Sequence, residues 1–139
     1  MEIRLVLLGG RRKNPRMAER DARYAMFQAK TGGLMTLEEK TALEELKRVL
    51  QERCGATSVV VYGSKARGDD SPDSDIDVMV VLEDYTPQIE AAVDEAVYEI
   101  NLAHDCLISV VIFGRRELEE GPLGESPLYK RILAEGVPV

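Results

Sequence analysis

Residues 63–68 read Gly-Ser-Lys-Ala-Arg-Gly, and residues 74–77 read Ser-Asp-Ile-Asp at the start of an apolar run. The first segment is a turn of small residues, in which glycine allows a phosphate group to approach the backbone closely. The second places two carboxylates two positions apart, which is costly in a hydrophobic strand unless a cation neutralises them. Carboxylates and phosphate oxygens are the ligands that magnesium prefers. Together the two segments predict a site for a nucleoside triphosphate and magnesium.

Asp75 and Asp77 are the predicted metal ligands. Side chains alternate along a strand, so these two point the same way, about 7 Å apart along the backbone. They can converge on one magnesium ion or bridge two. The residue between them, Ile76, is expected to face the core.

The predicted nucleotide-binding residues are Gly63, Ser64, Lys65 and Arg67. Gly63 ends a β-branched run, and Ser64 offers both a hydroxyl and an amide to a phosphate. Lys65 and Arg67 either contact phosphate or simply extend into solvent, and the sequence does not decide between these alternatives. The three acids between the two motifs are expected to be surface loop acids: Asp69, Asp70 and Asp73.

The surrounding sequence predicts a mixed order of helices and strands. Thr36 and Glu39 match a capping box at the start of an apolar helical stripe, and Gly55 is a typical helix stop. Residues 115–117 are expected to begin a charged surface turn. The other elements follow from β-branched runs and from Thr-Pro and Ser-Pro helix starts: strands at 58–62, about 75–82 and 107–113, and helices at about 87–102 and 128–134.

The composition suits one domain preceded by an extension. The chain has 139 residues and a net charge of −7, which disfavours a broad grip on nucleic acid. Residues 1–30 hold eight Lys/Arg and three Asp/Glu, so this piece is basic and the remainder is strongly acidic. We expect residues 1–34 to be a basic N-terminal extension, flexible or loosely docked, and residues 35–139 to form the domain. No membrane-spanning or signal segment is evident, and two unclustered cysteines suit a cytoplasmic protein.

The quoted motifs resemble the signature of the DNA polymerase beta-like nucleotidyltransferase superfamily, and in particular its minimal nucleotidyltransferase group. That group is often paired genetically with an all-helical partner in toxin–antitoxin modules. The resemblance covers about residues 36–139. It implies an α/β (α+β) fold, a polymerase beta palm-like mixed sheet with helices packed on one side. It also implies magnesium-dependent transfer of a nucleoside monophosphate, commonly AMP from ATP, to a hydroxyl group. In that scheme Ser64 would hold the terminal phosphates, and Asp75 and Asp77 the metals.

The sequence departs from the family pattern at a third carboxylate, which the family usually carries on the later strand. Here the aligned position is Ser109, and a serine cannot replace a carboxylate as metal ligand and base. Asp105, four residues earlier, is the candidate catalytic residue to take the place of this carboxylate together with Asp75 and Asp77, on the condition that the strand extends that far and so puts it on the same face. A loop acid before the strand is the alternative interpretation.

Two functions from different classes therefore remain open at this stage. One is an active nucleotidyltransferase acting on a protein or small-molecule acceptor. The other is a catalytically weak nucleotide-binding or interaction module, such as the antitoxin partner of a helical toxin. Because the chain is short, we expect a homo-oligomer or a helical partner protein to complete acceptor recognition. Template-directed DNA synthesis is disfavoured, since the chain lacks the length for template-binding domains.

Overall fold

A computed structural model describes residues 35–68 and 75–139. The expected extension at 1–34 and the acids Asp69, Asp70 and Asp73 lie outside these residues. Two long helices dominate the described part: α2 (Leu37–Cys54) and α4 (Pro87–His104). Helix α2 begins with the predicted capping box, in which the Glu39 amide donates to Thr36 Oγ1 at 3.1 Å and the Thr36 amide donates to Glu39 Oε1 at 3.0 Å. Local sequence therefore defines the start of α2.

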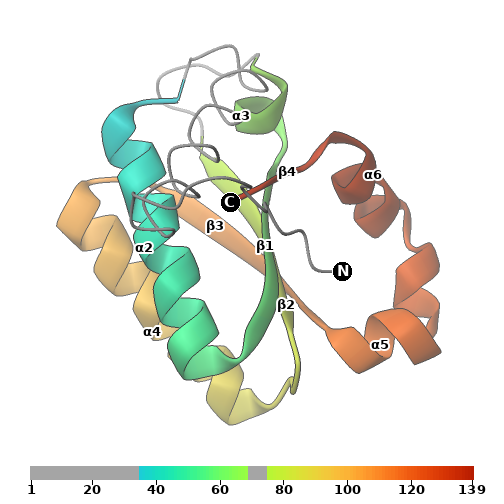
Figure 1. Cartoon of the computed structure of the whole chain (residues 1–139). Coiled ribbons are helices and arrows are strands. Elements are labelled where there is room, and N and C mark those ends of the chain that lie inside the picture. The colour runs from blue at the N-terminus through green and yellow to red at the C-terminus, as the bar shows by residue number, and fades with distance from the viewer. Residues whose placement is uncertain (1–34, 69–74) are drawn as a thin grey trace, which may run out of the picture.

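Among the described residues, the sheet has four strands in the order β3-β2-β1-β4. Strand β1 (Ala56–Tyr62) is antiparallel to both β2 (Ile76–Leu82) and β4 (Val137–Pro138), whereas β2 is parallel to β3 (Ile108–Gly114). The predicted mixed sheet is confirmed. Because β1 ends where β2 and β3 begin, the residues that follow β1 meet the first residues of the other two strands at one end of the sheet (Figure 1).

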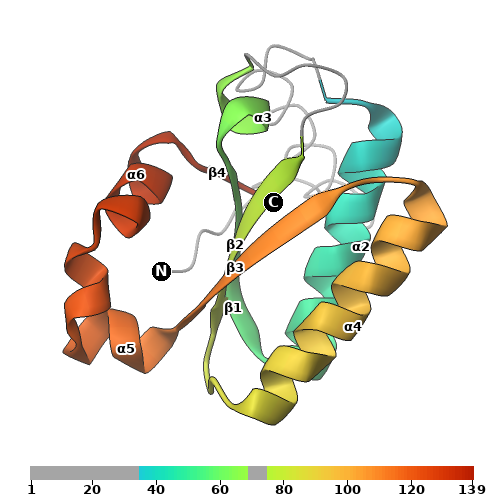
Figure 2. The ribbon, with the colours of Figure 1, turned by 180° about the vertical axis from the view of Figure 1, so that it is seen from behind.

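Helices cover the two faces of the sheet differently. The long helices α2 and α4 lie together on one face, as expected (Figures 1 and 2). Their buried side chains pack against alternate residues of the strands, among them Val61, Val78 and Val80. The opposite face carries a smaller cluster, in which Val60, Met79 and other strand residues meet the shorter helices α5 (Arg115–Glu120) and α6 (Pro127–Glu135). Asp77 alternates with Ile76 and Val78 and so lies on this second face.

One expectation about local structure was wrong. Residues 115–117 do not begin a turn but the helix α5, which leads through the short 3₁₀ helix η1 (Pro122–Glu125) into α6. In α5, Arg115 forms ion pairs with Glu119 one turn away, at 2.8 Å, and with Glu83 after β2, at 2.6 Å. Few side chains of α5 are buried, so its sequence is charged and lacks the apolar stripe that would predict a helix. Within the described residues, no helix is long and apolar enough to cross a membrane.

Candidate active site

The predicted phosphate turn lies at the junction of β1 and the four-residue helix α3 (Ser64–Arg67). Gly63 has φ +75°, which favours glycine, and the same is true of Gly68, which ends α3 at φ +79°. The Gly68 amide donates to the Ser64 carbonyl at 2.9 Å, so the motif closes into a single compact turn. Glycines at both ends therefore give the motif its shape.

Gly63 and Asp77 approach each other closely. A Cβ atom built on Gly63 would lie 2.6 Å from Asp77 Oδ2, so no side chain fits there without displacing the carboxylate. The preceding residue, Tyr62, pairs with Asp77 across the antiparallel strands. The structure thus brings the glycine turn and the second acid of the Asp-x-Asp motif into contact, although they are far apart in the sequence.

Asp75 and Asp77 form a like-charge pair. Burial raises the pKa of Asp77 above its ordinary value, and the Asp75 carboxylate raises it further, while the Arg67 guanidinium acts in the opposite direction. Asp75 directly precedes β2 and is exposed. A carboxylate pair of this kind is stabilised by a bound cation.

These carboxylates fit magnesium. Magnesium is usually held by one or two carboxylates, with substrate phosphates and water as its other ligands. Asp75 and Asp77 meet that need beside a turn suited to phosphate. In the described part of the chain, no group of three His, Cys, Asp or Glu side chains could hold a metal ion without such help.

The two basic residues of the turn are both engaged with carboxylates. Lys65 is only 3% exposed, and its ammonium lies 3.1 Å from Glu39 in α2. Arg67 is partly exposed, and its Nη1 atom lies 3.2 Å from Glu135 Oε1 in α6. Lys65 therefore joins α3 to the helix layer, and Arg67 joins it to the opposite face.

Ser109 is the residue that the resemblance aligns with a third carboxylate. This residue pairs with Asp77 in the parallel register of β2 and β3, and it is exposed. Asp105 lies outside β3, which begins at Ile108. It ends α4 in a left-handed conformation, φ +50°, and its side chain is exposed. The condition under which Asp105 would share the strand face is therefore not met.

Two further polar residues border this end of the sheet, and motif reasoning missed both. Tyr62 is half-buried on the Asp77 face. Burial raises its pKa, as does the Asp77 carboxylate, while the Arg131 guanidinium of α6 lowers it. In the sequence, Tyr62 is only the last residue of the strand expected at 58–62. Arg131 carries no local signal, because only the packing of α6 brings it near β1.

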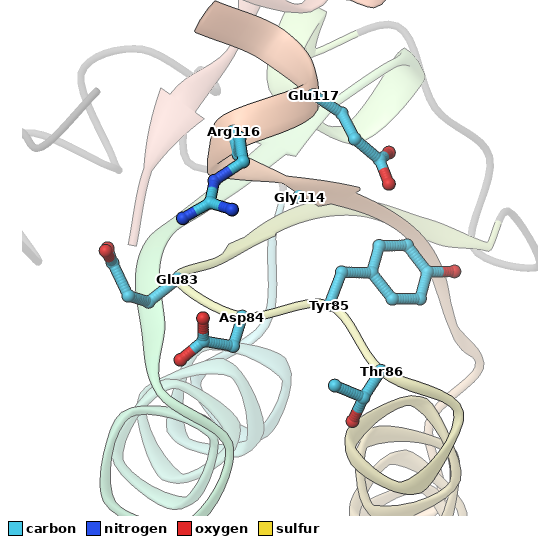
Figure 3. Close-up of a pocket in the computed structure, with 7 residues that line it drawn as sticks. All are labelled: Glu83, Asp84, Tyr85, Thr86, Gly114, Arg116 and Glu117. Carbon is cyan, nitrogen blue, oxygen red and sulfur yellow. The ribbon is translucent and has the colours of Figure 1, made fainter. Parts of the chain in front are cut away.

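A pocket of about 200 Å³ lies at the other end of the sheet, beyond the ends of β2 and β3 (Figure 3). Its lining includes three carboxylates and one guanidinium, from Glu83, Asp84, Glu117 and Arg116. The lining is thus predominantly acidic, which disfavours a triphosphate. The phosphate turn and the Asp75–Asp77 pair remain the better candidate site.

Comparisons with known proteins agree with the fold. A solved structure described as "putative minimal nucleotidyltransferase" matches 78% of this chain and 100% of its own, with 28% identity and a TM-score of 0.50. No curated protein matches the sequence. The family model for the nucleotidyltransferase domain matches residues 43–137, a span that includes the glycine turn, both aspartates and Ser109. The resemblance inferred from the motifs is confirmed, and the chain belongs to the nucleotidyltransferase domain family.

Proposed function

We propose that this chain transfers a nucleoside monophosphate, AMP from ATP, to a hydroxyl group of a protein or small-molecule acceptor in the presence of magnesium. The observation that carries the proposal is the contact between the Gly63 turn and Asp77. A phosphate bound to the backbone of Gly63 and Ser64 would lie beside the Asp75–Asp77 pair. The metal-binding and phosphate-binding halves of the motif therefore serve one substrate.

The chemistry proposed is an in-line displacement. The acceptor oxygen forms a bond to the α-phosphorus, the bond from that phosphorus to the bridging oxygen breaks, and pyrophosphate leaves with the electron pair. The hydroxyl proton passes to water or to a carboxylate. Magnesium, when bound by Asp75 and Asp77, would neutralise charge on the phosphates. The chain itself orients the triphosphate through the Gly63–Ser64 backbone and keeps its α-phosphate near Asp77.

A second candidate function is supported by Ser109. In register with Asp77, this position provides a hydroxyl where a third carboxylate would lie. Loss of that carboxylate would spare nucleotide binding more than transfer, because Asp75 and Asp77 still form a dication site. The alternative is therefore a nucleotide-binding or interaction module, for example an antitoxin that covers a helical toxin.

We also propose that a second polypeptide, a helical partner or another copy of this chain, supplies part of the acceptor site. Large apolar side chains near the same end of the sheet support this. Leu102 at the end of α4 is 66% exposed, and Leu107, just before β3, is 64% exposed. An isolated monomer that still modifies a hydroxyl acceptor, as judged by light scattering and label transfer, would contradict this part of the proposal.

The test uses α-labelled ATP, GTP, CTP and UTP with magnesium and candidate acceptors, including purified helical partner proteins. We expect label from ATP to appear on the acceptor, and to be lost in Asp75→Asn and Asp77→Asn. Asp94→Asn, on the exposed surface of α4, is the matched control. Tight binding of ATP without transfer would favour the module. If the chain neither binds nor transfers a nucleotide, both candidates are refuted.

A further inference from the structure

Arg131 lies on α6, on the face of the sheet that carries Asp77. The next residue, Ile132, is 0% exposed and packs in the same apolar cluster as Val60 and Met79. Tyr129 packs edge-on against Phe113 of β3, with ring centroids 5.7 Å apart. These contacts fix the position of α6, and Arg131 is attached to a well-anchored helix.

One side of α6 faces the phosphate turn. Arg131 and Glu135 are four residues apart and so lie on the same side of the helix. Glu135 reaches Arg67 of α3 at 3.2 Å, which shows that this side of α6 is directed toward the turn. Figure 1 shows α3 and α6 at neighbouring positions beside β4. Arg131 therefore lies on the side of α6 that approaches the candidate site.

Arg131 also lies near the end of β1. The next residue, Ile132, lies in the apolar cluster that contains Val60 of β1, and Tyr62 packs against the same cluster. Tyr62 directly precedes Gly63 and pairs with Asp77. Arg131 is consequently attached on the β1 side of Asp77, whereas Ser109 lies on the β3 side.

The distribution of charge around the candidate site favours a role for Arg131 in binding phosphate. A triphosphate brings several negative charges to a site that already holds two carboxylates. The nearby cations Lys65 and Arg67 are each engaged with a glutamate. Arg131 is exposed, and within residues 35–68 and 75–139 its guanidinium has no carboxylate partner. A guanidinium can hold two phosphate oxygens at once.

We propose that Arg131 is a nucleotide-binding residue that contacts the terminal phosphates of the triphosphate bound at Gly63 and Ser64. The proposal rests on the proposed function. Because Arg131 lies on the β1 side, it is assigned to the pyrophosphate portion of the nucleotide, the leaving group, and not to the acceptor. Arg131 thus distinguishes triphosphates from monophosphates.

The experiment measures the affinities of the full chain for ATP and AMP in magnesium by titration calorimetry. We expect Arg131→Gln to weaken ATP binding about tenfold or more, because a charge-assisted contact is lost. AMP binding should change less than about twofold, since AMP lacks the terminal phosphates. Arg131→Lys should recover part of the ATP affinity. Lys130→Gln is the matched control: Lys130 is adjacent, its side chain is 60% exposed and it pairs with Glu125, so ATP affinity should stay at the wild-type value.

Two outcomes would overturn the assignment. One is wild-type ATP affinity in Arg131→Gln, and the other is an equal loss for ATP and AMP, which would indicate a disturbed fold or a contact to the nucleoside. Thermal unfolding of each variant separates these causes. Failure of the wild-type chain to bind any triphosphate would instead refute the proposed function itself. The two failures are therefore distinguishable.

Discussion

Asp77 of β2 and Ser109 of β3 are directly paired across two parallel strands, so their side chains extend from the same face of the sheet. Ser109 is also exposed, and a longer side chain can be accommodated there. The position next to the carboxylate pair is thus open to a third acid.

We expect Ser109→Asp to increase the rate of nucleotidyl transfer at least about tenfold, because a positioned carboxylate can act as ligand and base. Without magnesium the same variant should unfold at a lower temperature, since a third negative charge joins the pair, and added magnesium should reverse that loss. Ser109→Asn, of similar size but uncharged, is the control and should show neither effect. A transfer rate in Ser109→Asp no greater than in Ser109→Asn would contradict the prediction.

The raised pKa of Asp77 predicts a dependence of stability on pH. The folded state binds the proton of the Asp77 carboxyl more tightly than the unfolded state does. In the unfolded state the pKa of this group is near its ordinary value of 3.8. Ionised Asp77 therefore destabilises the fold, and stability from this group rises as the pH falls through the folded pKa toward 3.8. Asp77→Asn should unfold at a higher temperature than wild type at pH 7 without metal.

That advantage should shrink as the medium becomes acidic and disappear below the unfolded pKa. Melting temperatures of both proteins, measured in a chelating buffer from pH 7 to pH 3, provide the check. A constant difference across this range would show that the effect of the substitution is not electrostatic.

Gly63 and Gly55 can be compared by substitution with alanine. Gly55 is left-handed helical, φ +68° and ψ +34°, where a side chain costs about 1 kcal/mol of backbone strain. Gly63 has φ +75° and ψ −154°, a conformation that only glycine adopts readily, so its backbone strain should be larger. At Gly55 nothing lies within 4 Å of the new Cβ, whereas at Gly63 Asp77 Oδ2 lies at 2.6 Å. We expect Gly63→Ala to be less stable than Gly55→Ala by about 2 kcal/mol or more in urea unfolding, because both the backbone strain and the contact with Asp77 are unfavourable. It should also lose triphosphate binding, which Gly55→Ala should keep; equal losses in the two variants would argue against a close contact.

The buried pair Lys65–Glu39 predicts unequal effects of its two partners. Glu39→Gln retains the capping box but removes one carboxylate partner of an ammonium that is 3% exposed, and should cost about 1–3 kcal/mol. Lys65→Met fills the same buried space and leaves Glu39 with some solvent, so it should cost about 1 kcal/mol or less. Chemical denaturation measures both. Lys65→Met should also bind ATP within about threefold of wild type, and a larger loss would assign Lys65 to phosphate binding.

Local signals in the sequence were sufficient to predict the helices and strands that carry the candidate site. The capping box at Thr36 defined the start of α2, and the β-branched run before Gly63 defined the end of β1. The apolar run at 107–113 predicted β3, which brings Ser109 into register with Asp77. In each case the determining interactions are within a few residues or follow from strand alternation.

Features that depend on tertiary packing were not accessible from sequence. Nothing near Lys65 indicates that it is buried against Glu39, and nothing near Arg131 indicates that α6 lies beside β1. The position of Asp105 also depends on packing. Whether Asp105 belongs to β3 depends on where α4 ends, and because α4 continues to His104, Asp105 ends the helix and is not part of the strand. His104 is held there by Glu45 and Glu38 of α2, at 2.6 and 2.5 Å.

Successive side chains of β2 point to opposite faces of the sheet, so residues that maintain the core alternate with residues that face the candidate site. Ile76 and Val78 face α2 and α4 and maintain the hydrophobic core, whereas Asp77 faces the other side and contacts the phosphate turn. A mutation at one set of positions leaves the packing of the other largely intact. A substitution on the Asp77 face, at a position such as Ser109, can therefore change the chemistry of the candidate site while the domain continues to fold.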